Sequence, residues 1–238
     1  MVANATILVM ALVFTLLIYL LLTLISTTTV FMVAMTLKNN SIMDIVYGPV
    51  FLIATTGTIF LADQFTVATT VVASLVALWS LRLSLRILHK NMGKPEDPRY
   101  AAWRAAWMKR GSLYFVVRSF LQIFVLQGVV IVGVSLPLII AITYADAIAA
   151  PWLLVGAGVW LLGFIIETTA DWQLDAFIAR KKAGTESANL MTTGLFRYSR
   201  RPNYFGETLI WWGFAVMVLA VPYGWLGVLG PLLITYIV

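Results

Sequence analysis

Long runs of apolar residues alternate with short stretches in which charged residues gather. The first run holds no charged residue between Asn4 and Leu37. Since about 20 apolar residues span the hydrocarbon core of a bilayer, runs of this length predict transmembrane helices. Further runs cover about 42–61, 67–88, 113–143, 151–177, 203–221 and 226–238. The pattern predicts an all-α integral membrane protein with about seven transmembrane helices.

Two of these runs leave their boundaries open. The first has no basic residue at its start, so we expect a retained helix over Met1 to about Ile25 and no cleaved signal peptide. The polar stretch from Ser26 to Thr29 either ends this helix or lies within a longer, tilted one. The run over 113–143 is too long for one straight crossing, and Pro137 predicts a kink in it.

Basic residues fall in alternate loops. Lys38 and the segments 82–118 and 180–201 carry them, whereas Asp63 and Asp146 mark the other loops. Because cytoplasmic loops are enriched in Lys and Arg, this pattern predicts an N-terminus outside and a C-terminus in the cytoplasm. Within the first basic loop, Trp103 and Trp107 predict a short amphipathic helix in the membrane interface over 100–108. The chain shows no internal repeat, and we expect one transmembrane domain over 1–238.

Composition narrows the possible chemistry. Of the 238 residues, 11% are charged and 61% are hydrophobic, which is typical of a multi-pass membrane protein. The absence of cysteine excludes disulfides and thiolate sites, and a single histidine leaves no expected metal site. The net charge of +6 is spread over loops, so it indicates membrane orientation and not nucleic-acid binding. We expect the plasma or inner membrane in a bacterium, or the endoplasmic reticulum in a eukaryote.

The segment 194–213 combines cationic, aromatic and amide side chains at the start of an apolar run. Arg200 and its neighbours can bind phosphate or carboxylate oxygens in pairs, and Pro202 suits the first turn of a helix. On that helix Asn203 and Glu207, four residues apart, would share one face. Either the arginines anchor a transmembrane helix on its cytoplasmic side, or the cluster binds an anionic ligand.

Carboxylates recur in two other membrane segments. Glu167, Asp171 and Asp175 follow at intervals of four, so they line one helix face. A carboxylate at the bilayer centre costs roughly 2.5–3.5 kcal/mol, which predicts either a functional role or ion pairs that tie this helix to the loops. Asp44 has Tyr47 one turn later. Either desolvation raises the pKa of Asp44 so that it serves as a proton donor, or Asp44 is a solvated residue at the helix start that the helix dipole favours.

Four motifs resemble the steroid 5-alpha-reductase superfamily, in particular its mainly microbial branch, which is related to the isoprenylcysteine carboxyl methyltransferases. The strongest is GLFRYSRRPNYFGE over 194–207, which occurs together with ETTADWQ over 167–173. The likeness extends to LWSLRL over 78–83 and to the stretch 91–100, so it covers most of the chain beyond residue 40.

The resemblance implies a seven-helix membrane reductase that binds NADPH from the cytosolic side and reduces a carbon–carbon double bond conjugated to a ketone in a lipid-like substrate. It places Asp44, with Tyr47 beside it, near the acidic residue that hydrogen-bonds the substrate ketone. Cofactor contacts are expected within the segment of about 80–238. The implied residues are Asn91, Lys94, Glu167, Asp171, Arg197, Tyr198, Arg200, Asn203, Tyr204 and Glu207.

The sequence departs from the family pattern in three places. Arg201 stands where relatives often have histidine, and no tyrosine near Ser80 matches the one that partners the acidic group in the steroid enzymes. The chain ends at Val238, so we expect the cytoplasmic segment that follows in relatives to be missing. Two alternatives stay open: an S-adenosylmethionine-dependent membrane methyltransferase, which shares the basic-Pro-x-Tyr-x-Gly element, and a non-catalytic membrane protein of this fold.

Overall fold

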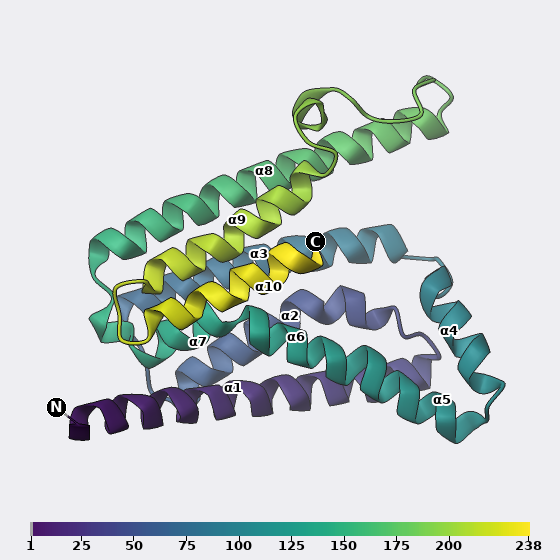
Figure 1. Cartoon of the computed structure of the whole chain (residues 1–238). Helices are drawn as coiled ribbons and strands as arrows, with labels where there is room; N and C mark the ends of the chain where they lie inside the picture. Colours follow the sequence, from purple (N-terminus) through teal and green to yellow (C-terminus); the bar gives the residue numbers. More distant parts are fainter. Residues whose placement is uncertain (1) are drawn as a thin grey trace. The chain divides into compact units, whose positions relative to one another are not determined.

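The computed structural model describes residues 2–238, and its regular elements there are all helical. Close contacts divide the chain into two compact units, Met1–Asp146 and Ala147–Val238. Figure 1 labels the α-helices of both units. The first unit contains α1 (Val2–Leu37), α2 (Ile42–Leu61), α3 (Val67–Asn91), α4 (Pro98–Met108), α5 (Ser112–Ser119), the π-helix η1 (Phe120–Val125), α6 (Leu126–Val134) and α7 (Leu136–Thr143). After the 3₁₀ turn η2 (Ala145–Ala147), the second contains α8 (Ala150–Lys182), η3 (Gly194–Arg197), α9 (Pro202–Val218), η4 (Gly224–Val228) and α10 (Leu229–Ile237).

Five helical segments in the described chain are long and apolar enough to cross a membrane. They are Ala5–Leu37, Ile42–Leu61, Val67–Asn91, Ser112–Val134 and Ala150–Lys182. The protein is therefore a multi-pass integral membrane protein, as the sequence predicts. The count of seven crossings, the orientation and the single domain stay predictions.

Helix α1 passes through its polar stretch without ending. The Ser26 and Thr29 hydroxyls donate hydrogen bonds of 2.7 Å and 2.9 Å to the carbonyls of Leu22 and Ile25, one turn back in the same helix. Hydroxyls that bond the preceding turn need no water, so they are compatible with a helix in lipid. Of the two alternatives for this stretch, the longer helix is the one that forms.

The apolar run over 113–143 is broken into several helices, because two local features interrupt it. The π-helix η1 inserts an extra residue into the turn between α5 and α6. A second break falls at Ser135, and α7 starts at Leu136 with Pro137 in its first turn. Proline has no N–H to donate, so the first turn of a helix accommodates it. In place of the predicted kink at Pro137, one helix ends and a new one starts at Leu136.

The core of the first unit forms where α1, α2 and α3 pack together. Phe51 of α2 and Trp79 of α3 are both fully buried and meet edge to face, with ring centroids 5.2 Å apart. Gly48 lets the two helices approach, since a Cβ there would lie 2.9 Å from the Ser80 carbonyl oxygen. Tyr19 of α1 donates a 2.8 Å hydrogen bond to Ser135, which fixes α1 against the break before α7.

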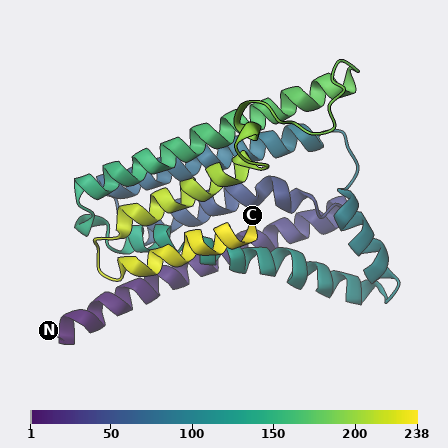
Figure 2. The ribbon, with the colours of Figure 1, turned by 45° about the horizontal axis from the view of Figure 1, so that its top comes forward.

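In the second unit, α8 and α9 form a tight antiparallel pair, which runs side by side in both Figure 1 and Figure 2. Glycines occupy the contact: Gly163 faces Gly206, and Gly156 faces Gly213. A Cβ on Gly206 would lie 2.6 Å from the backbone nitrogen of Glu167, so a larger residue does not fit there. Gly158 of the same helix has nothing within 4 Å of an added Cβ, so close packing is limited to the glycines that face α9.

Candidate functional site

The loop between α8 and α9 is tied to α8 by one glutamine. Gln173 accepts a 2.9 Å hydrogen bond from the backbone N–H of Leu195 through its Oε1. Gly194 lies directly over this amide with a φ of 61°, and a Cβ at this position would lie 2.4 Å from Oε1. Glycine therefore meets two demands here: a left-handed backbone conformation and the close approach of a side chain.

A pocket of about 350 Å³ lies within the second unit, where this loop meets the start of α9. Leu174 and Phe177 of α8 and Leu190 of the loop form its apolar side. Its polar lining comes from the start of α9 and the residues before it, namely Arg200, Arg201, Asn203 and Tyr204. The pocket thus pairs an apolar wall with cationic and amide groups.

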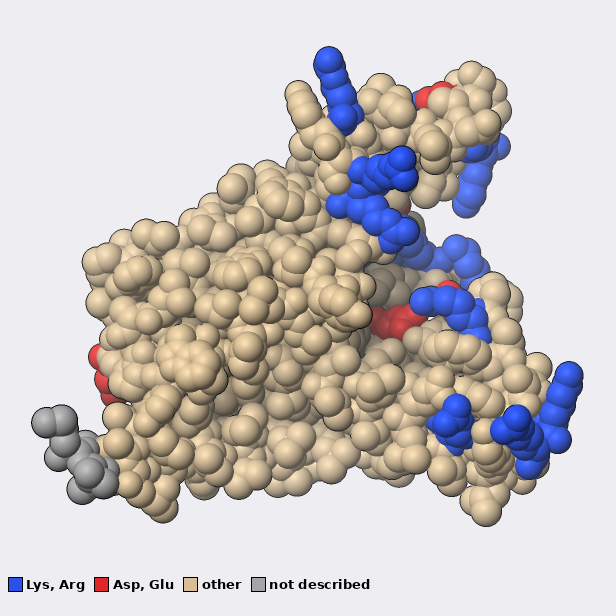
Figure 3. Space-filling view, in the orientation of Figure 1, with Lys and Arg blue, Asp and Glu red and all other residues tan. Residues whose placement is uncertain are grey.

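The polar side of the pocket is suited to an anion. The Arg200 and Arg201 side chains are exposed, and the Arg201 guanidinium lies 4.7 Å from the centre of the Tyr204 ring. Pro202 stands in the first turn of α9, so the positive end of this helix dipole lies here. On the face seen in Figure 3, blue Lys and Arg atoms gather at this end of the second unit.

The other predicted cofactor residues of this unit do not line the pocket. Glu167 and Asp171 are buried in α8, each only 5% exposed. Glu207 of α9 accepts a 2.9 Å hydrogen bond from the indole N–H of Trp211. Arg197 and Tyr198 lie outside the pocket lining, with Tyr198 84% exposed. The pocket therefore brings together Arg200, Asn203 and Tyr204 of the predicted cofactor residues, together with Arg201.

In the first unit, Asn91 is the last residue of α3 and Lys94 lies in the turn after it. The Lys94 ammonium donates a hydrogen bond to the Lys90 carbonyl oxygen. A cation at this place also complements the negative end of the helix dipole, so Lys94 has a local structural role. Its predicted contact with a cofactor, like that of Asn91, stays a prediction.

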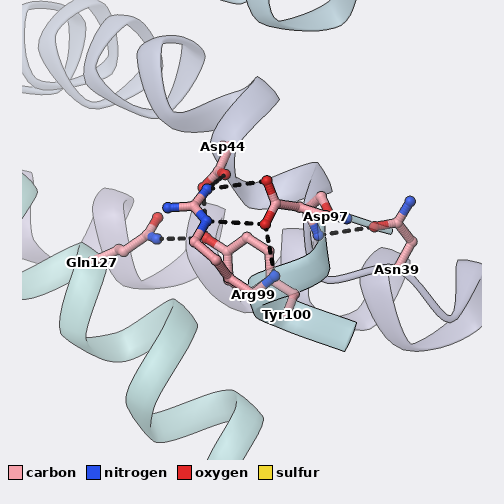
Figure 4. A network of polar contacts seen from close by, with 7 residues as sticks. Asn39, Asp44, Asp97, Arg99, Tyr100 and Gln127 are labelled. Carbon is pink, nitrogen blue, oxygen red and sulfur yellow. Dashed lines mark hydrogen bonds and ion pairs between the residues drawn. The ribbon is translucent and has the colours of Figure 1, made fainter. Parts of the chain in front are cut away.

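Asp44 is the centre of a polar network that joins three helices of the first unit (Figure 4). The Tyr100 hydroxyl of α4 donates a 2.6 Å hydrogen bond to Asp44 Oδ1. The Arg99 Nη2 lies 3.3 Å from Asp44 Oδ2, and Gln127 of α6 donates to the Tyr100 hydroxyl over 3.5 Å. The Asp44 carboxyl thus has a hydrogen-bond donor on one oxygen and a guanidinium beside the other.

Burial and charge keep the proton on Tyr100. The side chain is 4% exposed, and this burial, the charge of Asp44 and the hydrogen bond to it together raise the Tyr100 pKa well above its usual value. Hydrogen bonds from Arg99 lower the pKa of Asp97, although burial acts in the opposite direction and raises it. The same hydrogen bonds raise the pKa of Arg99. The cluster thus combines a neutral phenol with the ionised Asp97–Arg99 pair.

The segment before α4 is fastened to the turn between α1 and α2. Arg104 donates hydrogen bonds of 2.8 Å and 2.9 Å to Glu96, which also accepts one of 2.6 Å from the backbone N–H of Asn40. The backbone N–H of Asp97 donates to the Ser41 hydroxyl over 2.7 Å. Burial raises the pKa of Glu96, but these hydrogen bonds and the Arg104 charge outweigh it and leave the pKa below its usual value.

Tyr100 is the member of this network that sequence reasoning missed. It lies 56 residues from Asp44 in the chain, whereas the family pattern has its tyrosine near Ser80, where this sequence has none. Tyr47, the partner suggested by spacing, packs edge to face on Phe51 with centroids 5.2 Å apart. The signal that could have found Tyr100 is the motif over 91–100, which ends on this residue.

Long apolar helices with polar clusters beside their ends define this chain as a multi-pass membrane protein with two candidate polar sites. Residues 30–238 match the family described as "Protein of unknown function (DUF1295)", and the chain belongs to this family. It is also distantly similar to 3-oxo-5-alpha-steroid 4-dehydrogenase 1, which confirms the resemblance to the steroid 5-alpha-reductases.

The similarity to those enzymes covers part of each chain. The protein of Bos taurus is 34% identical over 83 residues, which are 34% of this chain and 31% of the bovine protein. The protein of Homo sapiens is 36% identical over 74 residues, 31% of this chain and 27% of the human protein. The matched region therefore spans less than a third of the length of these curated relatives. No solved structure matches the chain.

Proposed function

We propose that this protein is an NADPH-dependent membrane oxidoreductase that reduces a carbon–carbon double bond of a lipid-like enone, steroid or otherwise. The partial similarity to 3-oxo-5-alpha-steroid 4-dehydrogenase 1 supports this reaction class. The observation that carries the proposal is the pocket at the start of α9, where Arg200, Arg201 and Asn203 stand beside an apolar wall.

The chemistry of the pocket fits a phosphate-bearing cofactor. Arginine guanidinium groups bind phosphate oxygens in pairs, and the positive end of the α9 dipole favours an anion. A volume of about 350 Å³ is at the low end for small-molecule sites, so we propose that the pocket takes a phosphate-bearing part of NADPH. The full proposed set is Asn91, Lys94, Glu167, Asp171, Arg197, Tyr198, Arg200, Asn203, Tyr204 and Glu207.

The acid–base part of the reaction is assigned to the Asp44 network. When bound, NADPH supplies a hydride to the substrate. Tyr100 holds a proton on its hydroxyl, and Asp44 orients that hydroxyl through the 2.6 Å hydrogen bond. The single Tyr100 O–H is donated to Asp44, so a substrate ketone would have to replace the carboxylate oxygen as its acceptor in order to be polarised. Tyr47 lies one turn after Asp44 on α2 and is proposed to shape the same site.

We further propose seven membrane crossings, with the N-terminus outside and the C-terminus in the cytoplasm. The five long segments would be joined by α9 and by the shorter apolar segment Gly224–Ile237. A helix of 17 residues is about 25 Å long, which is near the lower limit for a transmembrane helix. This topology places both basic loops, 82–118 and 180–201, in the cytoplasm.

Thermal unfolding of the purified protein in detergent tests the cofactor. NADPH at a hundredfold excess over its dissociation constant should stabilise the protein by about 2.7 kcal/mol. Asn203→Ala and the double variant Arg200→Gln/Arg201→Gln should lose this effect. Lys181→Gln/Lys182→Gln removes the same charge from exposed positions of α8 and should keep it.

The alternatives predict different outcomes in the same assay. Stabilisation by S-adenosylmethionine and not by NADPH would replace the reductase with a methyltransferase. Stabilisation by neither ligand would indicate a non-catalytic protein. An equal NADPH effect in Asn203→Ala and in the wild type would remove the α9 pocket from the cofactor site.

A further inference from the structure

We propose that the corner between α4 and α5 binds the headgroup of an anionic phospholipid, a role separate from the reductase site. This α4–α5 corner consists of Trp107, Lys109, Arg110, Tyr114 and Arg118. It lies in the first unit, at the point where the candidate membrane segment Ser112–Val134 begins. Figure 3 shows blue Lys and Arg atoms gathered over this region.

Aromatic rings hold the two arginines in position. Arg110 donates a 3.1 Å hydrogen bond to the Tyr114 hydroxyl, and its guanidinium carbon lies 5.3 Å from the centre of that ring. The Arg118 guanidinium carbon lies 5.8 Å from the Trp107 ring and 5.9 Å from the Tyr114 ring. Tyr114 thus stands between two arginines at intervals of four residues, so the cations are ordered on one surface.

The charge of the corner is not neutralised by the protein. Within the described chain, no acidic side chain lies in ion-pair distance of Lys109, Arg110 or Arg118, and all three are exposed. By contrast, nearby Arg104 is taken up by Glu96 at 2.8 Å. Two ring-held guanidinium groups and a neighbouring ammonium, without a carboxylate, are complementary to a phosphate group, which the guanidinium groups can bind with their outward N–H donors.

The surroundings favour a lipid over a soluble phosphate. Leu113 and Val117, on the first two turns of α5, are 76% and 45% exposed. Apolar side chains next to a cationic surface suit the boundary between headgroups and acyl chains. Gly111, with a φ of 104° and open space around it, makes the sharp turn that brings the end of α4 back onto α5. A phospholipid whose phosphate binds the arginines would have its acyl chains along α5.

Native mass spectrometry of the purified protein in a neutral detergent tests the site, with phosphatidylglycerol and phosphatidylcholine as probes. We expect phosphatidylglycerol to bind at least about tenfold more tightly, because each cation near an anionic headgroup contributes severalfold. Arg110→Gln/Arg118→Gln should weaken phosphatidylglycerol binding about tenfold or more and leave phosphatidylcholine binding unchanged. Lys181→Gln/Lys182→Gln serves as the matched control and should bind like the wild type.

A single variant guards against loss of folding in the double one. Lys109 has an exposed side chain and no hydrogen bond or ion pair in the described structure, so Lys109→Gln should fold normally and still weaken phosphatidylglycerol binding severalfold. Equal binding of both lipids by the wild type would overturn the proposal. An equal loss of phosphatidylglycerol binding in Lys181→Gln/Lys182→Gln would also overturn it. Binding of inorganic phosphate at the same concentration as the lipid would show that the site does not require a lipid, and would likewise overturn the proposal.

Discussion

The Tyr100 hydroxyl and the Asp44 carboxylate share a 2.6 Å hydrogen bond although 56 residues separate them in the chain. The bond connects the short helix α4 to the start of the apolar helix α2. Arg99 also donates to the Asp44 carboxylate and Gln127 to the Tyr100 hydroxyl, so each member of the pair has a second partner. This arrangement gives the first unit a fixed acid–base pair close to a membrane segment.

Tyr100→Phe removes the donor of this bond while keeping the aromatic ring. A hydrogen bond to a charged group contributes about 1.5–3 kcal/mol, so the free energy of unfolding should fall by an amount in this range. Reduction of an enone substrate should also slow, since the proposed proton-holding group is lost. Denaturant unfolding and NADPH oxidation in detergent measure the two effects.

Tyr236→Phe is the matched control, because its ring is 90% exposed in α10. It should leave both the free energy of unfolding and the rate unchanged. Equal stability of the two variants would show that the Tyr100–Asp44 bond contributes nothing to folding. A destabilised Tyr100→Phe protein with the wild-type rate would assign the bond a structural role alone.

Asp44→Asn separates cofactor binding from turnover. The amide oxygen still accepts the hydrogen bond from Tyr100, and Arg99 is 68% exposed, so the loss of its ion pair costs little. We expect NADPH to stabilise the variant as it does the wild type, while the rate of reduction drops. Normal binding together with normal turnover would exclude Asp44 from the mechanism.

The membrane helices could be predicted from the sequence because their signal is local. A run such as 42–61 carries its own length and hydropathy, and α2 occupies the same residues, Ile42–Leu61. The end of α1 stays open in the sequence, since the stretch from Ser26 to Thr29 fits either a helix end or a longer, tilted helix. Their hydroxyls bond the preceding turn, and sequence alone does not decide between that geometry and a turn.

The candidate site could be predicted only where the residues are close in sequence. Arg200, Asn203 and Tyr204 fall within one motif and line one pocket, whereas Arg197 and Tyr198 of the same motif lie outside it. Arg197 ends the 3₁₀ turn η3 and Tyr198 caps it, whereas Asn203 and Tyr204 lie in the first turn of α9. The Tyr100–Asp44 contact depends on how α4 folds back on α2, which no local pattern specifies.

Gly206→Ala should destabilise the second unit through the contact of α9 with α8. The added Cβ would lie 2.6 Å from the Glu167 nitrogen and 2.7 Å from the Gly163 carbonyl oxygen, and both are backbone atoms that cannot turn away. Overpacking of this kind typically costs about 1–3 kcal/mol. Gly158→Ala on α8 is the control, because nothing lies within 4 Å of its added Cβ. Gly158→Ala should stabilise the helix slightly in thermal unfolding, and equal losses in both variants would contradict close packing at Gly206.

Acid should weaken the attachment of the segment before α4 to the turn between α1 and α2. This attachment depends on the ionised form of Glu96, which accepts hydrogen bonds from Asn40 and Arg104. The Glu96 pKa in the folded protein lies below its ordinary value of 4.5, so folding favours the carboxylate. Its stabilisation is therefore fully present above pH 4.5 and is lost as the pH falls through the lower folded pKa. Asp97 shifts in the same direction, below its ordinary value of 3.8, so it adds to the loss at lower pH.

Glu96→Gln isolates the contribution of Glu96 to this pH dependence. The variant should unfold at a lower temperature than the wild type at neutral pH, and the gap should close as the pH is lowered past 4.5. Arg104→Gln, which removes the partner that donates to Glu96 at 2.8 Å and 2.9 Å, should show a gap that closes over the same range. Thermal unfolding across a pH series measures all three proteins. A gap of constant size down to acid pH would mean that the variants act through packing and not through the charge of Glu96.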